Sequence, residues 1–232
     1  DVLKVLERNL ESGDTFIDVG ANIGFLSLNL ARHVGLNGHV VAIDPQQSMP
    51  ERIREHCRMN DIENISVVEA AMSDCVGYAS FNVATDLGLS RLDNRKGSTF
   101  GMERSDSYTV EKTTLDHVVD RELTGVPPAA CKIDVEGHEL QVLKGARMIL
   151  EQKRTTFVVE IIPGALNEND VKLCDIVELL ESFEYSVYWI QSHYADWFRL
   201  TRQPTLEKID SKNLSNARSG DIIAFPPVAS PS

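Results

Sequence analysis

The side-chain types best suited to proton transfer are concentrated between residues 132 and 139, which read Lys-Ile-Asp-Val-Glu-Gly-His-Glu after a short apolar run. Carboxylates and imidazole are the usual general acids and bases of enzymes. Asp134, Glu136 and His138 are therefore predicted catalytic residues. Glu160 ends the next apolar run, so we expect it to face the same crevice, because the carboxyl ends of parallel strands meet at one sheet edge.

A second informative stretch is Thr15–Gly24, TFIDVGANIG, an apolar run followed by a glycine turn and another apolar run. This pattern predicts a buried strand, a tight turn and a helix. A dinucleotide-binding turn has the pattern GxGxxG, in which the second glycine lets the backbone approach a pyrophosphate. Asn22 takes that position between Gly20 and Gly24, which disfavours a dinucleotide.

Two acids stand near the ends of successive predicted strands. Asp18 stands two residues before Gly20, and Asp44 ends the next apolar run. A carboxylate is a poor neighbour for phosphate but accepts hydrogen bonds from an ammonium group or a ribose diol. S-adenosylmethionine has both groups, carries a sulfonium and has no phosphate, so the pattern favours this ligand. Asp18 alone has a structural alternative as a residue that caps the turn.

Several segments together resemble the FkbM-type S-adenosylmethionine-dependent methyltransferases. They are DVGANIGF, VVAIDP, NISVVEAAMSD, KIDVEGHELQVLKGA and VVEI. The resemblance covers residues 14–162 and extends weakly to 225. It implies a Rossmann-like sheet of seven strands with an antiparallel last strand, and methyl transfer to a hydroxyl oxygen, often on a sugar or a polyketide-like metabolite.

The resemblance also implies roles for individual residues. Asp18, Gly20 and Asn22 would line the methionine end of the cofactor, and Asp44, where the family more often has Glu, would hold the ribose. The segment 70–72 would flank the adenine, and the methyl group would point toward Asp134. The predicted cofactor-binding residues are Asp18, Gly20, Ala21, Asn22, Gly24, Asp44, Ala71, Met72 and Asp134.

The order of apolar runs predicts an α/β fold with a doubly wound, mostly parallel sheet in one domain, residues 1–232. The expected strands are 15–19, 39–43, 64–71, 130–135, 157–162, 185–190 and 221–225. Helices are expected at 1–10, within a leading segment 1–13, and at 25–33, 50–57, 140–150 and 171–183, and a short helix is expected to begin at 114–116. Residues 193–216 are expected to be mostly irregular.

Residues 78–114 interrupt this order with two half-exposed strands, 78–83 and 108–112, and a polar connection. We predict a β-hairpin-like insertion with a mobile tip, and we expect the segment 88–91 to lie near the methyl acceptor. Residues 226–232 are expected to form a disordered tail.

Composition limits the remaining classes. A net charge of −12 over 232 residues, without clustered Lys and Arg, argues against nucleic-acid binding. No apolar run is long enough for a membrane span and no secretory leader is present, so we expect a cytoplasmic protein. The four cysteines lack a CxxC pair and are expected to be free thiols.

Alternatives remain at each level. Lys132 and Asp134 can form a structural ion pair. Glu136 and Glu139 can serve the start of the following helix, where its dipole favours carboxylates. His138 can be a packing residue of the core. The acids can also bind Mg²⁺, which nothing in the sequence supports, so no metal ligand is assigned. At the level of function, a nicotinamide-dependent oxidoreductase and a non-catalytic cofactor-binding domain stay open, as do the acceptor and the oligomeric state.

Overall fold

Strand β1 (Thr15–Val19) lies at the centre of the structure, a computed structural model that describes residues 1–84, 91–92, 104–191, 204–212, 214 and 218–227. Its neighbouring side chains Phe16 and Ile17 are both fully buried, but they belong to different apolar clusters. Because successive side chains of a strand point to opposite faces, both faces of the sheet are covered.

The main sheet has eight strands among the described residues, in the order β11-β10-β12-β9-β8-β1-β2-β3. The pairs from β3 to β9 are parallel, whereas β12 is antiparallel to both β9 and β10, and β11 is antiparallel to β10. The other seven strands are β2 (His39–Ile43), β3 (Ile65–Val68), β8 (Ala130–Ile133), β9 (Thr156–Ile161), β10 (Ser186–Gln191), β11 (Thr205–Ile209) and β12 (Gly220–Phe225).

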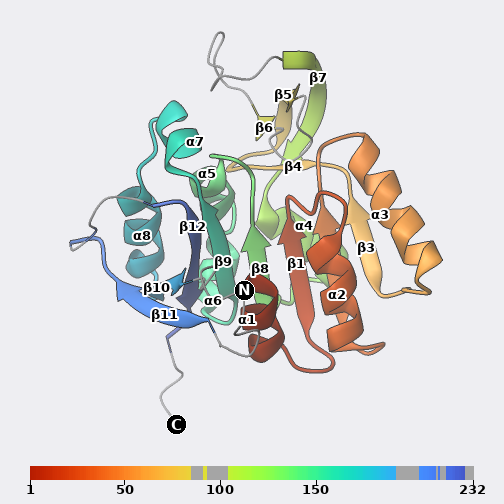
Figure 1. The fold of residues 1–232 in the computed structure, drawn as a ribbon, viewed down its shortest axis with the longest axis horizontal. Helices are drawn as coiled ribbons and strands as arrows, with labels where there is room; N and C mark the ends of the chain where they lie inside the picture. Colours follow the sequence, from red (N-terminus) through yellow and green to blue (C-terminus); the bar gives the residue numbers. More distant parts are fainter. Residues whose placement is uncertain (85–90, 93–103, 192–203, 213, 215–217, 228–232) are drawn as a thin grey trace, which may run out of the picture.

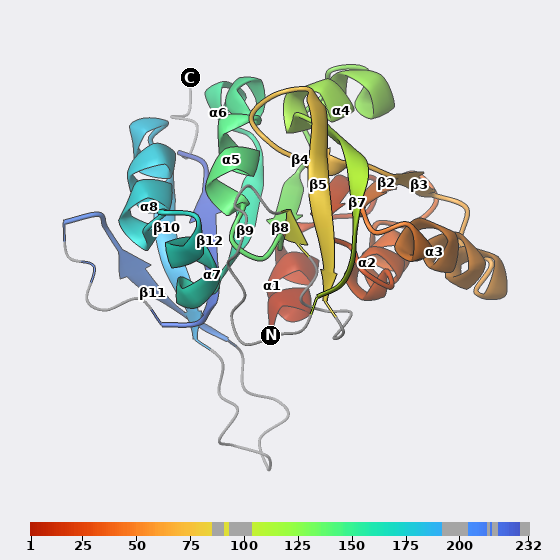
Figure 2. The same ribbon diagram turned by 90° about the horizontal axis from the view of Figure 1, so that it is seen from above.

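Helices cover both faces of this sheet (Figure 2). Residues of α1, α2 and α3 pack on one face, and residues of α4, α5, α6 and α8 pack on the other. The helices are α1 (Val2–Asn9), α2 (Phe25–Val34), α3 (Ser48–Met59), α4 (Leu115–Leu123), α5 (Glu139–Lys144), α6 (Arg147–Gln152), α7 (Pro163–Glu168) and α8 (Leu173–Ser182). The predicted doubly wound α/β architecture is confirmed.

The predicted count of seven strands is wrong, because β11 adds an eighth strand at one edge. β11 lies within residues 193–216, which were expected to be mostly irregular. The first four residues of this strand are exposed, so its sequence lacks the apolar alternation that identifies a strand covered on one face. The predicted antiparallel direction of the last strand, β12, is confirmed.

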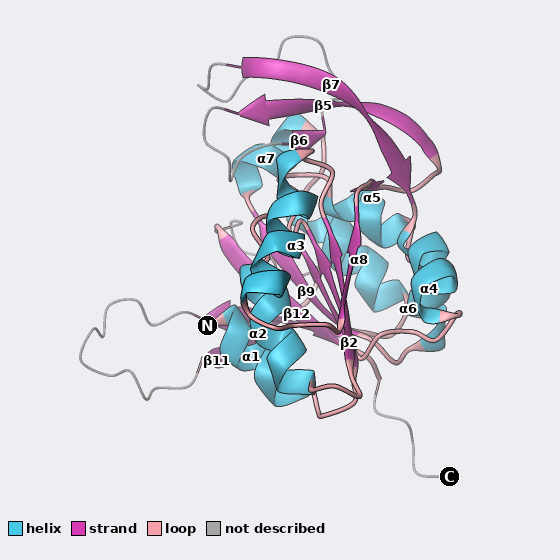
Figure 3. Ribbon diagram, turned by 90° about the vertical axis from the view of Figure 1, so that its right-hand side faces the viewer, coloured by secondary structure: helices cyan, strands magenta, loops and turns pink. Residues whose placement is uncertain are grey.

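A second sheet lies beyond the carboxyl ends of β1 and β8 (Figures 1 and 3). It has the order β4-β7-β5-β6, and β5 and β7 form a long antiparallel ladder. Its strands are β4 (Ala71–Met72), β5 (Gly77–Ala84), β6 (Arg91–Leu92) and β7 (Arg104–Thr113). The single strand expected over 64–71 is therefore two strands in different sheets. Residues 85–90 and 93–103, including most of the predicted acceptor segment 88–91, lie outside the described residues, as do residues 228–232 of the expected tail.

Two local predictions are corrected at helix boundaries. The helix expected over 140–150 is two helices, α5 and α6, which are separated by Gly145 and Ala146. A side chain at Gly145 would place its Cβ 2.0 Å from the Ser73 carbonyl oxygen, so this position requires glycine. Pro163 was expected only to end a strand, but it begins α7, where its missing amide hydrogen needs no partner. No helix in the described part of the chain is long and apolar enough to cross a membrane.

Candidate functional site

The turn after β1 uses its own backbone amides to hold neighbouring strands together. The amides of Gly20 and Ala21 both donate to the Ile43 carbonyl oxygen, at 2.9 and 3.0 Å. The Asn22 amide donates to Asp44 Oδ2 at 2.8 Å, and the Gly24 amide donates to Ala21 O at 2.8 Å. A phosphate-binding turn needs free amides. These four amides already have partners, so the turn is poorly suited to a pyrophosphate.

Gly20 is required by the close approach of two strands. Its φ is +80°, and a Cβ at this position would lie 1.8 Å from the carbonyl oxygen of Asp134. Only glycine fits such a contact without moving the backbone. Glycine at this position therefore allows the turn after β1 to lie directly against the end of β8, where the predicted catalytic residues begin.

Asp44 is a buried carboxylate held by two backbone amides. Oδ2 accepts the hydrogen bond from Asn22, and Oδ1 accepts one from the Gln46 amide at 2.9 Å. Burial raises the pKa of Asp44 to about 6, although both hydrogen bonds favour the charged form. A carboxylate has about four acceptor positions, so each oxygen keeps one for a further donor.

A cavity of about 240 Å³ opens at the carboxyl ends of β1, β2, β8 and β9. Its polar lining includes four carboxylates, those of Asp44, Asp134, Glu136 and Glu160, and it has no Lys or Arg among the described residues. The remaining lining residues are Val19, Gly20, Asn22, Ile43, Pro45, Gln46, Ala70, Ala71, Met72, Phe81, Val135 and His138. The lining therefore combines acidic and apolar residues, which favours a cationic ligand with an apolar group.

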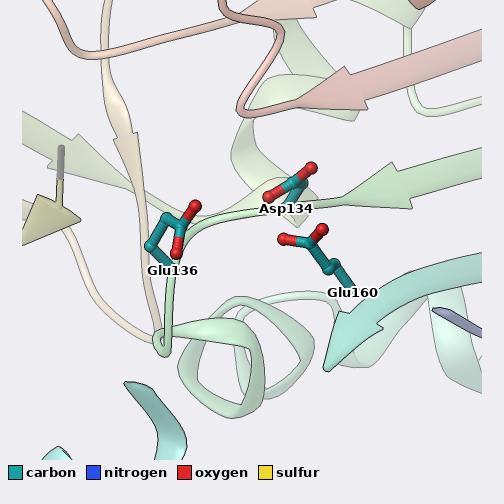
Figure 4. A group of neighbouring side chains, drawn as sticks. All are labelled: Asp134, Glu136 and Glu160. Carbon is teal, nitrogen blue, oxygen red and sulfur yellow. The ribbon is translucent and has the colours of Figure 1, made fainter. Parts of the chain in front are cut away.

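Three of the four carboxylates form a close group, which we call the acid group: Asp134, Glu136 and Glu160. One oxygen of each lies within 4.8 Å of the others. Figure 4 shows Glu160 on β9 directed toward Asp134, which follows β8, with Glu136 on the loop beyond. Burial, followed by the hydrogen bond to Asp134 and its negative charge, raises the pKa of Glu160 to about 9. Glu160 therefore keeps its proton near pH 7, and its hydrogen bond to Asp134 accounts for their contact. We assign no metal to the group.

This proton gives an expected pH dependence of stability. The pKa of Glu160 is raised from 4.5 to about 9, so folding gains from its proton below pH 4.5 and loses that gain as the pH rises toward 9. We expect the free energy of unfolding to fall by roughly 0.5–1 kcal/mol per pH unit from this group, a value reduced for solvent screening. Urea unfolding at several pH values should show the fall in the wild type and a weaker one in Glu160→Gln. Equal slopes in the two proteins would contradict the assigned proton.

The chain also matches the sequence model of a known family. The model, described as the methyltransferase FkbM domain, matches residues 18–187, which include the turn after β1, Asp44 and the acid group. The chain belongs to the FkbM methyltransferase family. The resemblance stated from the sequence motifs is therefore confirmed.

The chain is also similar to a curated relative and to several solved structures. Hexuronic acid methyltransferase AglP of Haloferax volcanii is 30% identical over 172 residues, which are 74% of this chain and 65% of that protein. The chain thus spans slightly less than two thirds of this curated relative. Among solved structures, methyltransferase FkbM from Methylobacillus flagellatus has a TM-score of 0.58 and 16% identity, over 93% of this chain and 44% of that chain. A Streptococcus mutans protein solved with SAH has a TM-score of 0.51 and 12% identity, over 97% and 95% of the two chains. These two structures support the fold.

Asp18 lies within the family match but is not among the residues that line the cavity. It is 2% exposed and accepts a hydrogen bond from Ser27 Oγ at 2.6 Å. Burial raises the pKa of Asp18 to about 6, against the opposing effects of Ser27 and the Lys132 charge. Ala21 and Gly24 also lie outside the lining. The structure therefore places Gly20, Asn22, Asp44, Ala71, Met72 and Asp134 of the predicted cofactor set at the cavity.

His138 lines the cavity of the FkbM domain and is held by a serine. Its Nε2 lies 3.1 Å from Ser73 Oγ, and the residue is 5% exposed. Burial lowers the pKa of His138 to about 4, although the charge of Asp74 opposes this shift. The imidazole is therefore neutral near pH 7, the form in which it can accept a proton.

The proposed structural alternatives for the acidic segment are partly present. Lys132 Nζ lies 3.4 Å from Asp134 Oδ2, so the ion pair exists, but Asp134 also lines the cavity. Glu139 accepts hydrogen bonds from the Val135 and Gly137 amides, at 3.3 and 2.9 Å, and thus holds the turn that carries Glu136. Glu136 itself lines the cavity.

The sequence did not identify Phe81 and Gln46 as residues of the site. Phe81 comes from β5 in the second sheet and is 3% exposed, next to the ring of Tyr108. The Tyr108 hydroxyl accepts a hydrogen bond from the Gln47 amide at 2.9 Å, which joins this sheet to the segment after Asp44. The apolar alternation of 78–83 was visible in the sequence, but it could not show which surface the strand would cover.

Proposed function

We propose that this chain transfers the methyl group of S-adenosylmethionine to a hydroxyl oxygen of a small molecule, with a sugar as the favoured acceptor. The observation that carries the proposal is the cavity itself, which has four carboxylates and no Lys or Arg in its described lining. A cationic adenosine ligand without phosphate matches this charge, whereas a dinucleotide does not.

Residues that line the cavity would contact both the adenosine part and the methionine part of the cofactor. The free acceptor positions of Asp44 suit the ribose hydroxyls, and Ala71, Met72 and Phe81 supply an apolar wall for the adenine. The acid group lines the same cavity, so its negative charge would face the methionine end. Bound S-adenosylmethionine supplies an electrophilic methyl group.

The acceptor side requires positioning and a proton acceptor. Holding an acceptor oxygen in line with the methyl group is worth roughly 7–11 kcal/mol, more than the 10²–10⁴-fold gain of a general base. Asp134, Glu136, Glu160 and His138 are the candidate bases. Among them, His138 is neutral near pH 7, but the burial that lowers its pKa also makes it a weaker proton acceptor, and Glu160 already holds a proton.

Support for a sugar comes from a relative. The Haloferax volcanii protein is named a hexuronic acid methyltransferase, so a sugar acid or a related sugar is the first acceptor class to test. A methyl ether on a hydroxyl and a methyl ester on a carboxylate differ in their stability to mild base. This difference separates O-methylation of a hydroxyl from esterification of a uronic acid.

The decisive experiment is calorimetric titration of the intact protein with S-adenosylhomocysteine, followed by methyl transfer from labelled S-adenosylmethionine to a panel of neutral sugars and uronic acids. We expect saturable binding and a base-stable labelled product. Absence of binding would refute the proposal, and a base-labile product would reassign the acceptor atom to a carboxylate. Binding without any labelled product across acceptor pools would support the non-catalytic alternative. A nicotinamide absorbance band in the purified protein would support the oxidoreductase alternative.

A further inference from the structure

Lys132 is a buried cation next to the acid group. It lies on β8 opposite Asp18 of β1 and Val158 of β9, and it is 3% exposed. A lysine so deeply buried is rare unless it is paired, because removing its charge from water is costly. The residue was expected at most to form an ion pair with Asp134, and the proposed reaction gives it no part.

The Lys132 ammonium group connects two segments that are far apart in the sequence. Its Nζ lies 3.4 Å from Asp134 Oδ2 and 3.3 Å from Asp221 Oδ1, and it donates to the Ile133 carbonyl oxygen at 3.4 Å. Asp221 belongs to β12, where it is the register partner of Glu160. Lys132 is thus paired with Asp221 and also contacts the acid group through Asp134.

The ionisable side chains that act on this ammonium group are all acidic. They are Asp18 of β1, Asp134 after β8, Glu160 of β9 and Asp221 of β12. Burial disfavours its charge, but these carboxylates outweigh burial and raise the pKa of Lys132 to about 12. It therefore carries a fixed positive charge beside carboxylates that line the cavity.

We propose that Lys132, held in place by Asp221, is a positioning residue that fixes the Asp134 carboxylate at the cavity wall and offsets the negative charge of the acid group. The inference rests on the proposed function for the role of Asp134, but the charge effect is measurable without any cofactor. Without this cation, Glu160 keeps its proton to a higher pH and Asp134 loses its anchor.

The test follows the Glu160 carboxyl by carbon NMR in protein labelled at glutamate carboxyls, with the signal assigned from its absence in Glu160→Gln. Glu160 faces Asp134, Lys132 and Glu136, and Lys132 is the cation that favours its ionised form. In Lys132→Gln and Lys132→Met we expect the Glu160 titration midpoint to rise by about one pH unit. Lys132→Arg, which keeps the charge, should retain the wild-type midpoint.

Two controls separate this role from a merely structural one. Lys153→Gln removes the lysine of the surface ion pair with Glu184 and should leave the Glu160 midpoint unchanged. A lysine that only ties β8 to β12 predicts lower thermal stability in Lys132→Gln with an unchanged midpoint, and that result would overturn the inference. Gln is used beside Met because its amide can still donate to Asp134 or Asp221, which favours folding.

Titration with S-adenosylhomocysteine completes the experiment. We expect Lys132→Gln to bind this probe at least about fivefold more weakly than Lys132→Arg, since one lost charged contact costs this much or more. If the wild type does not bind the probe, the proposed function fails, while the NMR result still decides whether Lys132 offsets the acid group. If the wild type binds and Lys132→Gln binds equally well with an unchanged Glu160 midpoint, the positioning role is refuted.

Discussion

Gly20→Ala is expected to be one of the most damaging single substitutions in this chain. The added Cβ would lie 1.8 Å from the Asp134 carbonyl oxygen, which is backbone and cannot rotate away. Either β1 and β8 separate or the turn changes its path, and both changes alter the cavity. We expect a loss of about 4 kcal/mol or more in unfolding free energy, the range of severe core disruptions. Urea unfolding measures this loss directly.

Gly13→Ala is the matched control for this substitution. Gly13 also has a positive φ, +96°, but a Cβ there would meet no atom within 4 Å. The cost should therefore be only the backbone strain of a left-handed residue, about 1–2 kcal/mol. Comparable losses in the two variants would show that φ, and not the contact with Asp134, makes Gly20 necessary.

Asp44→Asn is expected to have the second large effect, this time on binding. The carboxylate accepts the Asn22 and Gln46 amides, and in the proposed function it also accepts the ribose hydroxyls. An asparagine keeps one acceptor oxygen but turns an NH₂ group toward the other donors. Losing charged hydrogen bonds of this kind costs about 1.5–3 kcal/mol, or roughly ten- to a hundredfold in affinity. Calorimetric titration with S-adenosylhomocysteine measures the change.

Asp116→Asn offers a matched control for this effect. Asp116 also accepts two backbone amides, from Met148 at 2.9 Å and Ile149 at 3.2 Å, and it is absent from the cavity lining. Its loss should lower stability without changing the affinity for S-adenosylhomocysteine. If Asp44→Asn lowers stability as Asp116→Asn does, but leaves the affinity unchanged, Asp44 has only a structural role in shaping the turn.

Much of the fold could be predicted because the core strands carry strong local patterns. β1, β2, β8 and β9 are short apolar runs in which almost every residue is buried, and such runs are recognisable without any structure. Their carboxyl ends meet at one sheet edge by topology alone, so the acids that follow them were expected to lie together. The proximity of Asp134, Glu136 and Glu160 agrees with that reasoning.

Other features depend on contacts that no local pattern encodes. β11 is mostly exposed and carries polar residues, so its pairing with β10 follows from the position of the sheet edge and not from apolar alternation. The contribution of Phe81 depends on where the second sheet lies. The burial of Asp18 beside Ser27 depends on the path of α2, and the contact of Lys132 with Asp221 joins residues of β8 and β12. The catalytic roles of the acids and of His138 stay predictions.

The position of β12 between β9 and β10 has a consequence for the order in which the protein can assemble during synthesis. Both neighbours of β12 precede it in the chain, so neither β9 nor β10 can form its pairing with β12 until residues 220–225 have been made. Until then Asp221 is not available to the Lys132 ammonium group. Contacts of such long sequence separation form late because closing the intervening chain costs entropy. The acid group and its buried cation therefore reach their final arrangement only after almost all of this sequence has been made.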